Sequence, residues 1–353
     1  MTRPVGIRHF CVTRPDVDGG TRRFMGSALY PAADNDAPPA RIVDVLSPHV
    51  GPALDFLLRR ASSAQAAFLH ERLPRLTLYA RREPPVATAT GGHPVLLFNP
   101  GGESSRASCL PLSESLAAAG YVVLALDGVR DGPAQVFPDG EIDSPPLLPG
   151  ESPITPRIAD LRFLLDSLSA LNAQGPLAGS LDVHRVGALG HSRGGYLATI
   201  AAVEDERVRA AVNMDGFLWG HWTEGTGLNK WPAEFQARAR ALRTPILRLA
   251  GEQPSPSAAQ EKFALESRDF GSPFWFAALQ GFEHRLFSSA PYLCREPADA
   301  LAALERIDEH RRAIQVLAPV LTGFFDATLR GRPPAERLNV RAVDFFAAKP
   351  AAA

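Results

Sequence analysis

Residues 186–195 read VGALGHSRGG, an apolar run that leads into the pattern G-x-S-x-G, and a helical pattern begins at Tyr196. This order predicts a strand, a sharp turn with Ser192 at its tip, and a helix. Glycine at positions 190 and 194 lets the strand and the helix approach without a clash of side chains. The hydroxyl of Ser192 is then exposed at the end of a sheet, as a nucleophile must be. The competing interpretation is a glycine-rich turn whose serine only caps the helix.

Short apolar runs and helical stretches alternate along most of the chain, which is typical of βαβ units. Near the N-terminus, Ile7–Thr13 and Phe24–Tyr30 predict an antiparallel hairpin at a sheet edge. The sequence therefore predicts an α/β fold with a mostly parallel central sheet, an N-terminal antiparallel hairpin and helices on both faces. The expected parallel strands are Val95–Phe98, Tyr121–Leu126, Arg185–Leu189, Val208–Met214, Ile246–Ala250 and Phe274–Ala278, and the expected helices are Pro111–Ala119, Ile158–Leu171, Gly195–Val203, Pro232–Ala241, Ser257–Leu265 and Ala300–Leu329.

No internal repeat divides the 353 residues, so they are interpreted as a single domain (1–353). Residues 1–93 are expected to form the hairpin and a helical extension, in which apolar positions between 54 and 68 recur at helical spacing. Residues 94–330 are expected to form the core that carries Ser192. Two stretches interrupt the alternation, 128–156 with many Gly and Pro and 217–231 with three Trp, and both are expected to lie as a lid over the carboxyl edge of the sheet.

Charge and cysteine content exclude several classes of protein. Thirty-seven Lys and Arg against 38 Asp and Glu give a net charge of −1, so no net field attracts nucleic acid, and no nucleic-acid partner is expected. The sequence contains no run of 18 apolar residues, so no transmembrane segment is expected. Residues 1–10 lack the apolar centre of a signal peptide, so a cytoplasmic location is expected. Three cysteines at wide spacing fit neither a disulfide framework nor a metal site.

A serine hydroxyl is a weak nucleophile and needs a base, which one of nine histidines must supply. His284 is the expected base, because it follows the strand Phe274–Ala278 in a short loop from which an imidazole reaches the sheet edge. The competing interpretation is a loop histidine stabilised by Glu283. His191 adjoins the serine and is expected to point away from it in a packing role. Sequence position or simple packing accounts for the others, which are His9, His49, His70, His93, His184, His221 and His310.

Two carboxylates are candidates for the group that orients the base. Asp215 ends the strand Val208–Met214 beside the nucleophile strand, and Glu252 follows the next strand, Ile246–Ala250, at the more usual position for the acid. A buried carboxylate at either position would fix the imidazole tautomer and stabilise the imidazolium. The spacing alone leaves both open.

An oxyanion needs preorganised N–H donors. One is expected from the amide of Arg193, directly after the nucleophile, and the other from the glycine loop after the strand Val95–Phe98. Gly102 is the expected donor in that loop, with Gly101 as the alternative. No phosphate-binding G-x-x-x-x-G-K-[ST] pattern accompanies these glycines.

Together these motifs resemble the serine-dependent, plasma-type platelet-activating-factor acetylhydrolase family of α/β-hydrolases. The resemblance covers about residues 90–330, and it implies the α/β-hydrolase fold and esterase or lipase activity. It also implies that Asp215 is the acid, because in that family the acid follows the strand after the nucleophile. The chain departs from the family in Asn99–Pro100 and in Arg193. The motifs that carry the resemblance are Phe98–Gly102, Arg130–Gly132, Gly190–Gly195, Met214–Asp215 and Gly281–His284.

We therefore expect a serine hydrolase that cleaves carboxylic esters through Ser192, His284 and Asp215 and an acyl-enzyme, with no metal or organic cofactor. The expected partner is a small-molecule ester with an apolar acyl or alcohol part. The sequence leaves open whether the chain forms a homodimer. The alternatives are acyl transfer, thioester or peptide hydrolysis or a biosynthetic cyclisation on the same triad, and a non-catalytic binding protein. Four aromatic residues are expected to form an apolar lid and acyl pocket, and the alternative is that their side chains only pack within an insertion. They are Phe217, Trp219, Trp222 and Trp231.

Overall fold

The computed structural model of the chain describes residues 3–15, 20–34, 36–41, 44, 77–102, 104–128, 135–143, 152, 154–218, 232–288, 307–332 and 343–349. The helix expected around residues 54–68 lies outside the described residues. So do parts of the stretch 128–156 and all of 219–231, which contains three of the four residues expected to line a pocket.

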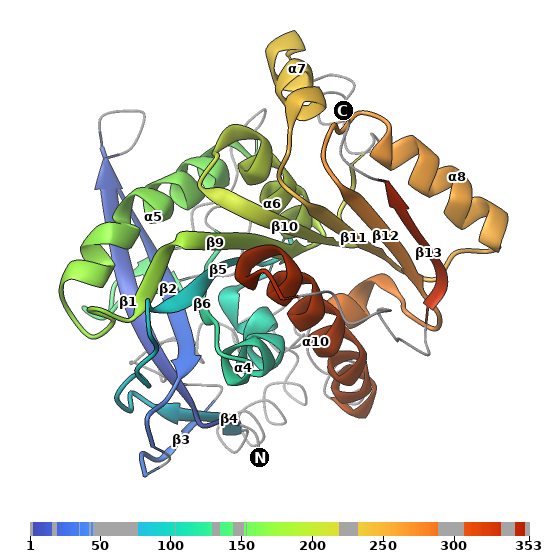
Figure 1. The fold of residues 1–353 in the computed structure, drawn as a ribbon. Helices are drawn as coiled ribbons and strands as arrows, with labels where there is room; N and C mark the ends of the chain where they lie inside the picture. Colours follow the sequence, from blue (N-terminus) through green and yellow to red (C-terminus); the bar gives the residue numbers. More distant parts are fainter. Residues whose placement is uncertain are drawn as a thin grey trace, which may run out of the picture.

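In the described part of the chain, eleven strands form one sheet (Figure 1). Their order across the sheet is β13-β12-β11-β10-β9-β5-β6-β2-β1-β4-β3. The separate strands β7 (Gln135–Val136) and β8 (Ile142–Asp143) pair with each other. The strands of the large sheet are β1 (Val5–Pro15), β2 (Thr21–Pro31), β3 (Pro39–Arg41), β4 (Thr77–Arg82), β5 (His93–Asn99), β6 (Val122–Leu126), β9 (Leu181–His191), β10 (Val208–Met214), β11 (Ile246–Ala250), β12 (Phe274–Leu279) and β13 (Val343–Lys349).

The centre of the sheet is parallel. Strands β6, β5, β9, β10, β11 and β12 each run parallel to the next one in this order. Strands β1 and β2 form an antiparallel hairpin, and β2 joins it to the centre by pairing antiparallel with β6. The predicted mostly parallel sheet with its N-terminal hairpin is thereby confirmed. The prediction lacked the short strands β3 and β4 and the antiparallel edge strand β13.

Helices cover both faces of this sheet (Figure 1). Successive side chains of a strand point to opposite faces, and both faces are apolar here. Leu96 and Phe98 of β5 pack in the buried cluster of α4 and α10, whereas Val95 and Leu97 pack in the cluster of the other helices. The helices are α4 (Leu110–Ala118), α5 (Thr155–Ala173), α6 (Arg193–Glu204), α7 (Ala233–Ala241), α8 (Pro256–Ser267) and α10 (Ile307–Arg330).

A buried charge cluster fastens the N-terminal hairpin to α5. One carboxylate oxygen of Asp160 in α5 accepts hydrogen bonds from the Nε atoms of Arg14 and Arg22, at 2.8 Å and 2.9 Å. All three side chains are almost fully buried. Buried charges are tolerated only when they are paired, so this cluster fixes the start of α5 relative to β1 and β2.

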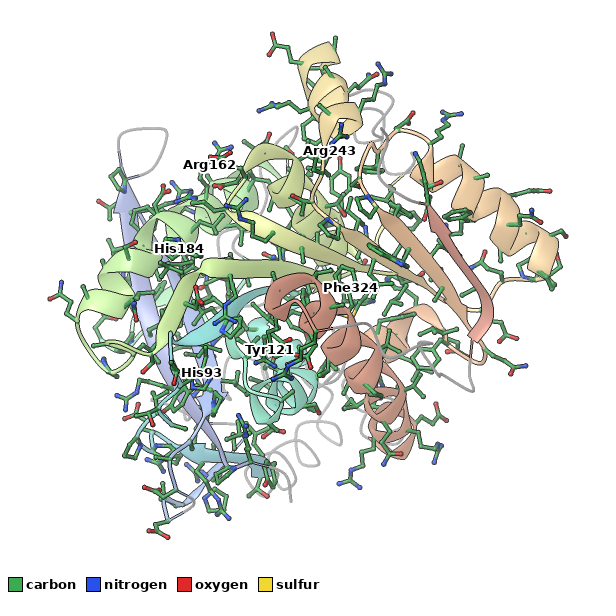
Figure 2. The ribbon with its side chains drawn as sticks, viewed as in Figure 1. His93, Tyr121, Arg162, His184, Arg243 and Phe324 are labelled. Atoms are coloured by element: carbon green, nitrogen blue, oxygen red, sulfur yellow. The ribbon has the colours of Figure 1, made fainter. Side chains whose placement is uncertain are left out.

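Parallel strands bring their carboxyl ends to one edge of a sheet. Ser192 follows β9 and Asp215 follows β10 at this edge. Figure 2 shows His93 and His184 near the starts of β5 and β9, away from this edge. Among the described residues, no helix combines the length and the apolar character that crossing a bilayer requires.

Candidate active site

The turn at Ser192 has the backbone geometry of a strained strand-to-helix corner. Ser192 has φ 54° and ψ −122°, a conformation that a residue with a side chain rarely adopts. Its amide donates to the carbonyl of Met214 at 2.8 Å, and its own carbonyl accepts from the amides of Gly195 and Tyr196. The Ser192 side chain makes no capping hydrogen bond to α6. The strain is therefore held by backbone contacts, and the hydroxyl is not used to cap the helix.

Glycines around this turn are required by close backbone contacts. A Cβ atom added at Gly194 would lie 2.0 Å from the carbonyl oxygen of Asn99, and one added at Gly190 would lie 2.3 Å from the carbonyl carbon of Gly194. A Cβ atom at Gly216 would lie 2.2 Å from the carbonyl oxygen of Ser192. No side chain fits at such distances, so β9, α6 and the loop after β10 approach Ser192 only because these residues are glycine.

His284 begins the short 3-10 helix η4 (His284–Phe287), which follows β12 after a turn at Gly281 with φ 70°. Its Nδ1 lies 2.6 Å from Oδ2 of Asp215. Because a carboxylate can only accept, Nδ1 carries the proton that it donates, and Nε2 of the neutral ring keeps its lone pair. The His284 side chain is 46% exposed, so this ring is open to a ligand at the sheet edge.

Asp215 follows β10 with a positive φ of 52°, and its amide donates to the carbonyl of Leu249 at 2.7 Å. The Oδ1 atom accepts from the amide of Gly251 at 3.0 Å and lies 3.8 Å from a guanidinium nitrogen of Arg248. Burial raises the pKa of Asp215, but the hydrogen bond from His284, the charge of Arg248 and the Gly251 amide together hold that pKa well below its usual range. Asp215 is therefore an anion at neutral pH.

Glu252 lies close to the same loop but bonds to backbone. Its Oε2 accepts from the amide of Gly281 at 3.2 Å, and its own amide donates to the carbonyl of Phe282 at 2.9 Å. The spacing in the sequence left open which of the two carboxylates orients the base. In the structure it is Asp215 that is hydrogen-bonded to the imidazole of His284. Glu252 supports the turn that precedes His284.

The glycine loop after β5 lies against Ser192. A Cβ atom added at Gly101 would lie 3.5 Å from Cβ of Ser192, and one added at Gly102 would lie 2.5 Å from Nη1 of Arg193. The guanidinium of Arg193 therefore covers Gly102. Within the described residues, neither the Gly101 amide nor the Gly102 amide donates a hydrogen bond. The loop thus brings two amides that have no acceptor among the described residues close to Ser192 and Arg193.

Comparisons with known proteins identify the fold that carries this arrangement of side chains. No family model matches the chain. A solved structure, the ferulic acid esterase from Streptomyces cinnamoneus, is similar with a TM-score of 0.69 and 25% sequence identity, over 96% of this chain and 94% of that one. The chain has the α/β-hydrolase fold.

A curated protein of Arthroderma benhamiae is similar to this chain in sequence. It is named as a probable 1-alkyl-2-acetylglycerophosphocholine esterase and is 33% identical over 153 residues, which are 41% of the present chain. The match spans 37% of the length of that relative. Both similar proteins are named as esterases, which confirms the predicted resemblance to acetylhydrolases and other ester hydrolases.

His191 makes a contact that the sequence did not predict. Its Nε2 donates to the carbonyl oxygen of His284 at 2.8 Å, and the two imidazole rings lie 4.6 Å apart between centroids. Burial and the neighbouring His284 lower the pKa of His191 to about 3, so the ring is neutral. The residue before Ser192 therefore ties the turn at Ser192 to the loop that carries His284. Its only sequence signal was its position next to the serine.

Most of the residues expected to line an acyl pocket lie outside the described part of the chain. Phe217, two residues after Asp215, is described and is 46% exposed. The other three lie outside the described residues and are Trp219, Trp222 and Trp231. Arg130 also lies outside the described residues. The pocket remains a prediction.

Proposed function

We propose that this chain is a serine hydrolase that cleaves carboxylic esters, with Ser192 as nucleophile, His284 as base and Asp215 as the acid that orients the base. The 2.6 Å hydrogen bond between Asp215 and Nδ1 of His284 carries the proposal, because it leaves Nε2 as a proton acceptor at the edge where Ser192 lies. The strained backbone of Ser192 supports it independently. The similarity to two named esterases supports the reaction class.

In the proposed reaction, Nε2 of His284 takes the proton of the Ser192 hydroxyl while the oxygen attacks the ester carbonyl carbon. The carbonyl oxygen becomes an oxyanion and accepts hydrogen bonds from the amides of Arg193 and Gly102, with Gly101 as the alternative donor in the loop. His284 then gives its proton to the leaving alcohol, and an acyl-Ser192 ester remains. A water molecule loses a proton to His284 and attacks that ester, and His284 then returns the proton to the Ser192 oxygen as the carboxylic acid leaves. Asp215 stays an anion throughout and stabilises the imidazolium.

The proposed substrate is a small-molecule ester with an apolar acyl or alcohol part. The exposed ring of Phe217, directly beyond the loop of Asp215, supports an apolar contact at the mouth of the site. One similar protein is named for a 1-alkyl-2-acetylglycerophosphocholine and the other for ferulic acid. We infer from these names only that ester substrates of different acyl groups suit this fold.

The nucleophile is tested with Ser192→Ala and a fluorophosphonate probe, which reacts with activated serines. We expect the variant to lose both labelling and turnover of p-nitrophenyl esters while its circular dichroism spectrum stays unchanged. Ser257→Ala is the matched control, because Ser257 is an exposed serine on α8 whose hydroxyl pairs with Ser255. Labelling or turnover that persists in Ser192→Ala contradicts the proposal. A parallel panel of ester, thioester and amide substrates, with and without an added alcohol, separates hydrolysis from the other acyl transfers.

A further inference from the structure

Arg157 is a buried arginine whose guanidinium binds the glycine loop beside Ser192. It lies in the first turn of α5 and is 4% exposed. Its Nη2 donates to the carbonyl oxygen of Pro100 at 2.6 Å, and its Nη1 donates to the carbonyl oxygen of Gly101 at 3.4 Å. Two successive carbonyl groups of the loop are therefore held by one planar group, which presents several N–H donors in fixed directions.

The direction of these carbonyls decides the direction of the amides that follow them. In a trans peptide the C=O and N–H bonds point to opposite sides, and the described chain has no cis peptide. Holding the carbonyl of Pro100 toward Arg157 turns the amide of Gly101 away from it, and the carbonyl of Gly101 does the same for the amide of Gly102. These are the two amides that donate no hydrogen bond within the described residues.

Arg157 is itself held in place at the start of α5. Asp160, one turn further along the helix, is bound by Arg14 and Arg22 of the hairpin. On its other side the loop is fixed by the turn at Ser192, because the carbonyls of Asn99 and Pro100 pack against Gly194. The loop therefore sits between a rigid helix start and the turn at Ser192.

We propose that Arg157 is a positioning residue of the oxyanion hole: its guanidinium fixes the peptides of Pro100 and Gly101 so that the donor amide of this loop, Gly102 or the alternative Gly101, is directed to the developing oxyanion. Arg157 itself does not touch the substrate. This inference rests on the proposed function. Preorganised donors contribute only when they are already aimed at the charge that forms in the transition state. The role therefore affects the rate of the chemical step and leaves binding of the uncharged ester nearly unchanged.

Arg157→Gln and Arg157→Lys test this role. We expect Arg157→Gln to lower kcat about 100-fold, with KM within about twofold of wild type. Lys carries its donors on a single nitrogen, so Arg157→Lys is expected to lose kcat to a smaller extent. The control is Arg162→Gln in the same helix, since Arg162 is exposed and pairs with Glu204 on the surface (Figure 2).

The second readout is the inhibition constant of an arylboronic acid, which forms a tetrahedral adduct with an active serine. We expect it to rise by the same factor by which kcat/KM falls, whereas general loosening of the fold would not couple the two quantities. Arg157→Lys supplies the same readouts if Arg157→Gln does not fold. Wild-type kcat in a folded variant, or an unchanged boronate constant beside lowered activity, overturns the inference. Activity that survives in Ser192→Ala refutes the proposed function instead, whatever the Arg157 variants do.

Discussion

At the scale of single residues, Ser192 and Asp215 share an unusual backbone. Both have positive φ, 54° and 52°, and both directly follow neighbouring parallel strands. Conformations of this kind cost about 1–3 kcal/mol each and persist where surrounding contacts enforce them. Here the amide of Ser192 is bound to Met214 and the amide of Asp215 is bound to Leu249. The strain thus turns two side chains out of their strands toward one sheet edge.

Asp215→Asn and Glu252→Gln separate the two carboxylates by function. An amide at position 215 no longer fixes the proton on Nδ1 of His284 or stabilises the imidazolium, so we expect kcat/KM to fall by about 10³–10⁴. Glutamine at position 252 still accepts from the Gly281 amide through its oxygen, and we expect a loss below about tenfold. Steady-state kinetics with a p-nitrophenyl ester measure both. The reverse ranking would assign the role of the acid to Glu252.

The spacing along the sequence located these two carboxylates but did not separate them, and only the family resemblance favoured Asp215. Asp215 and Glu252 follow adjacent parallel strands, so both come to the same edge, close to the loop that carries His284. The deciding quantity is the direction of each side chain, which depends on the turn at Gly281 and on the amide of Gly251. The contact of His191 with His284 depends likewise on a loop 93 residues away.

At the scale of elements, β11 and α8 supply a buried charged group behind Asp215. Arg248 of β11 is 1% exposed, and its Nε donates to Oε2 of Glu266 in α8 at 2.9 Å. Lys262 pairs with the other oxygen of Glu266. Because Arg248 also faces Asp215, it competes with the imidazolium for the charge of that carboxylate.

Removing this competition is expected to change the pH dependence of activity. In Arg248→Gln/Glu266→Gln, which leaves no buried charge unpaired, Asp215 stabilises protonated His284 more strongly. Because a protonated base cannot accept the proton of Ser192, we expect the acid limb of the kcat/KM profile to move to higher pH. Lys262→Gln keeps Arg248 and is expected to leave that limb in place. An acid limb that does not move in the double variant argues against electrostatic coupling.

Elements that are defined by local patterns were predicted well, and those defined by distant partners were missed. The strands Val208–Met214 and Ile246–Ala250 have the predicted bounds, since a continuous apolar run marks a strand buried on both faces. The strand β4, which lies between β1 and the edge strand β3, reads TLYARR, with buried residues only at Leu78 and Ala80. Such a half-polar segment becomes a strand through its pairing with β1 and β3, which no local pattern records.

At the scale of the whole molecule, Glu114 links protonation to folding. It lies in α4, is 9% exposed, and accepts from the amide of Ala80 in β4 at 2.6 Å. Burial raises its pKa to about 7 from a usual value of 4.5, although the amides of Ala80 and Tyr79 favour the anion. The folded protein therefore keeps a proton that the unfolded chain releases between these two values.

The sign of the resulting pH dependence follows from proton linkage. As pH rises through the window from 4.5 to about 7, this group lowers the free energy of unfolding by about 1.4 kcal/mol per pH unit. Glu114→Gln retains an oxygen for Ala80 and cannot ionise, so we expect it to be more stable than wild type at pH 8 and similar at pH 4.5. Urea unfolding at both pH values measures this, with the exposed Glu261→Gln as control. A stability difference that does not depend on pH contradicts the assignment.

The attachment of the hairpin to α5 is the connection between global stability and the site. Asp160→Asn leaves Arg14 and Arg22 buried without their carboxylate, and breaking a buried pair of this kind costs about 3–5 kcal/mol. Because Arg157 lies on the preceding turn of the same helix, we also expect kcat to fall at temperatures where the variant is still folded.

The control for this last change is Asp166→Asn on the exposed side of α5, where Asp166 pairs with Arg207 at the surface. Surface pairs contribute about 0–1 kcal/mol, so this variant is expected to keep both its urea midpoint and its kcat. Urea unfolding and kcat at 25 °C measure both variants. If Asp160→Asn loses stability but retains kcat, the start of α5 is held by contacts other than this cluster, and the site is independent of the hairpin.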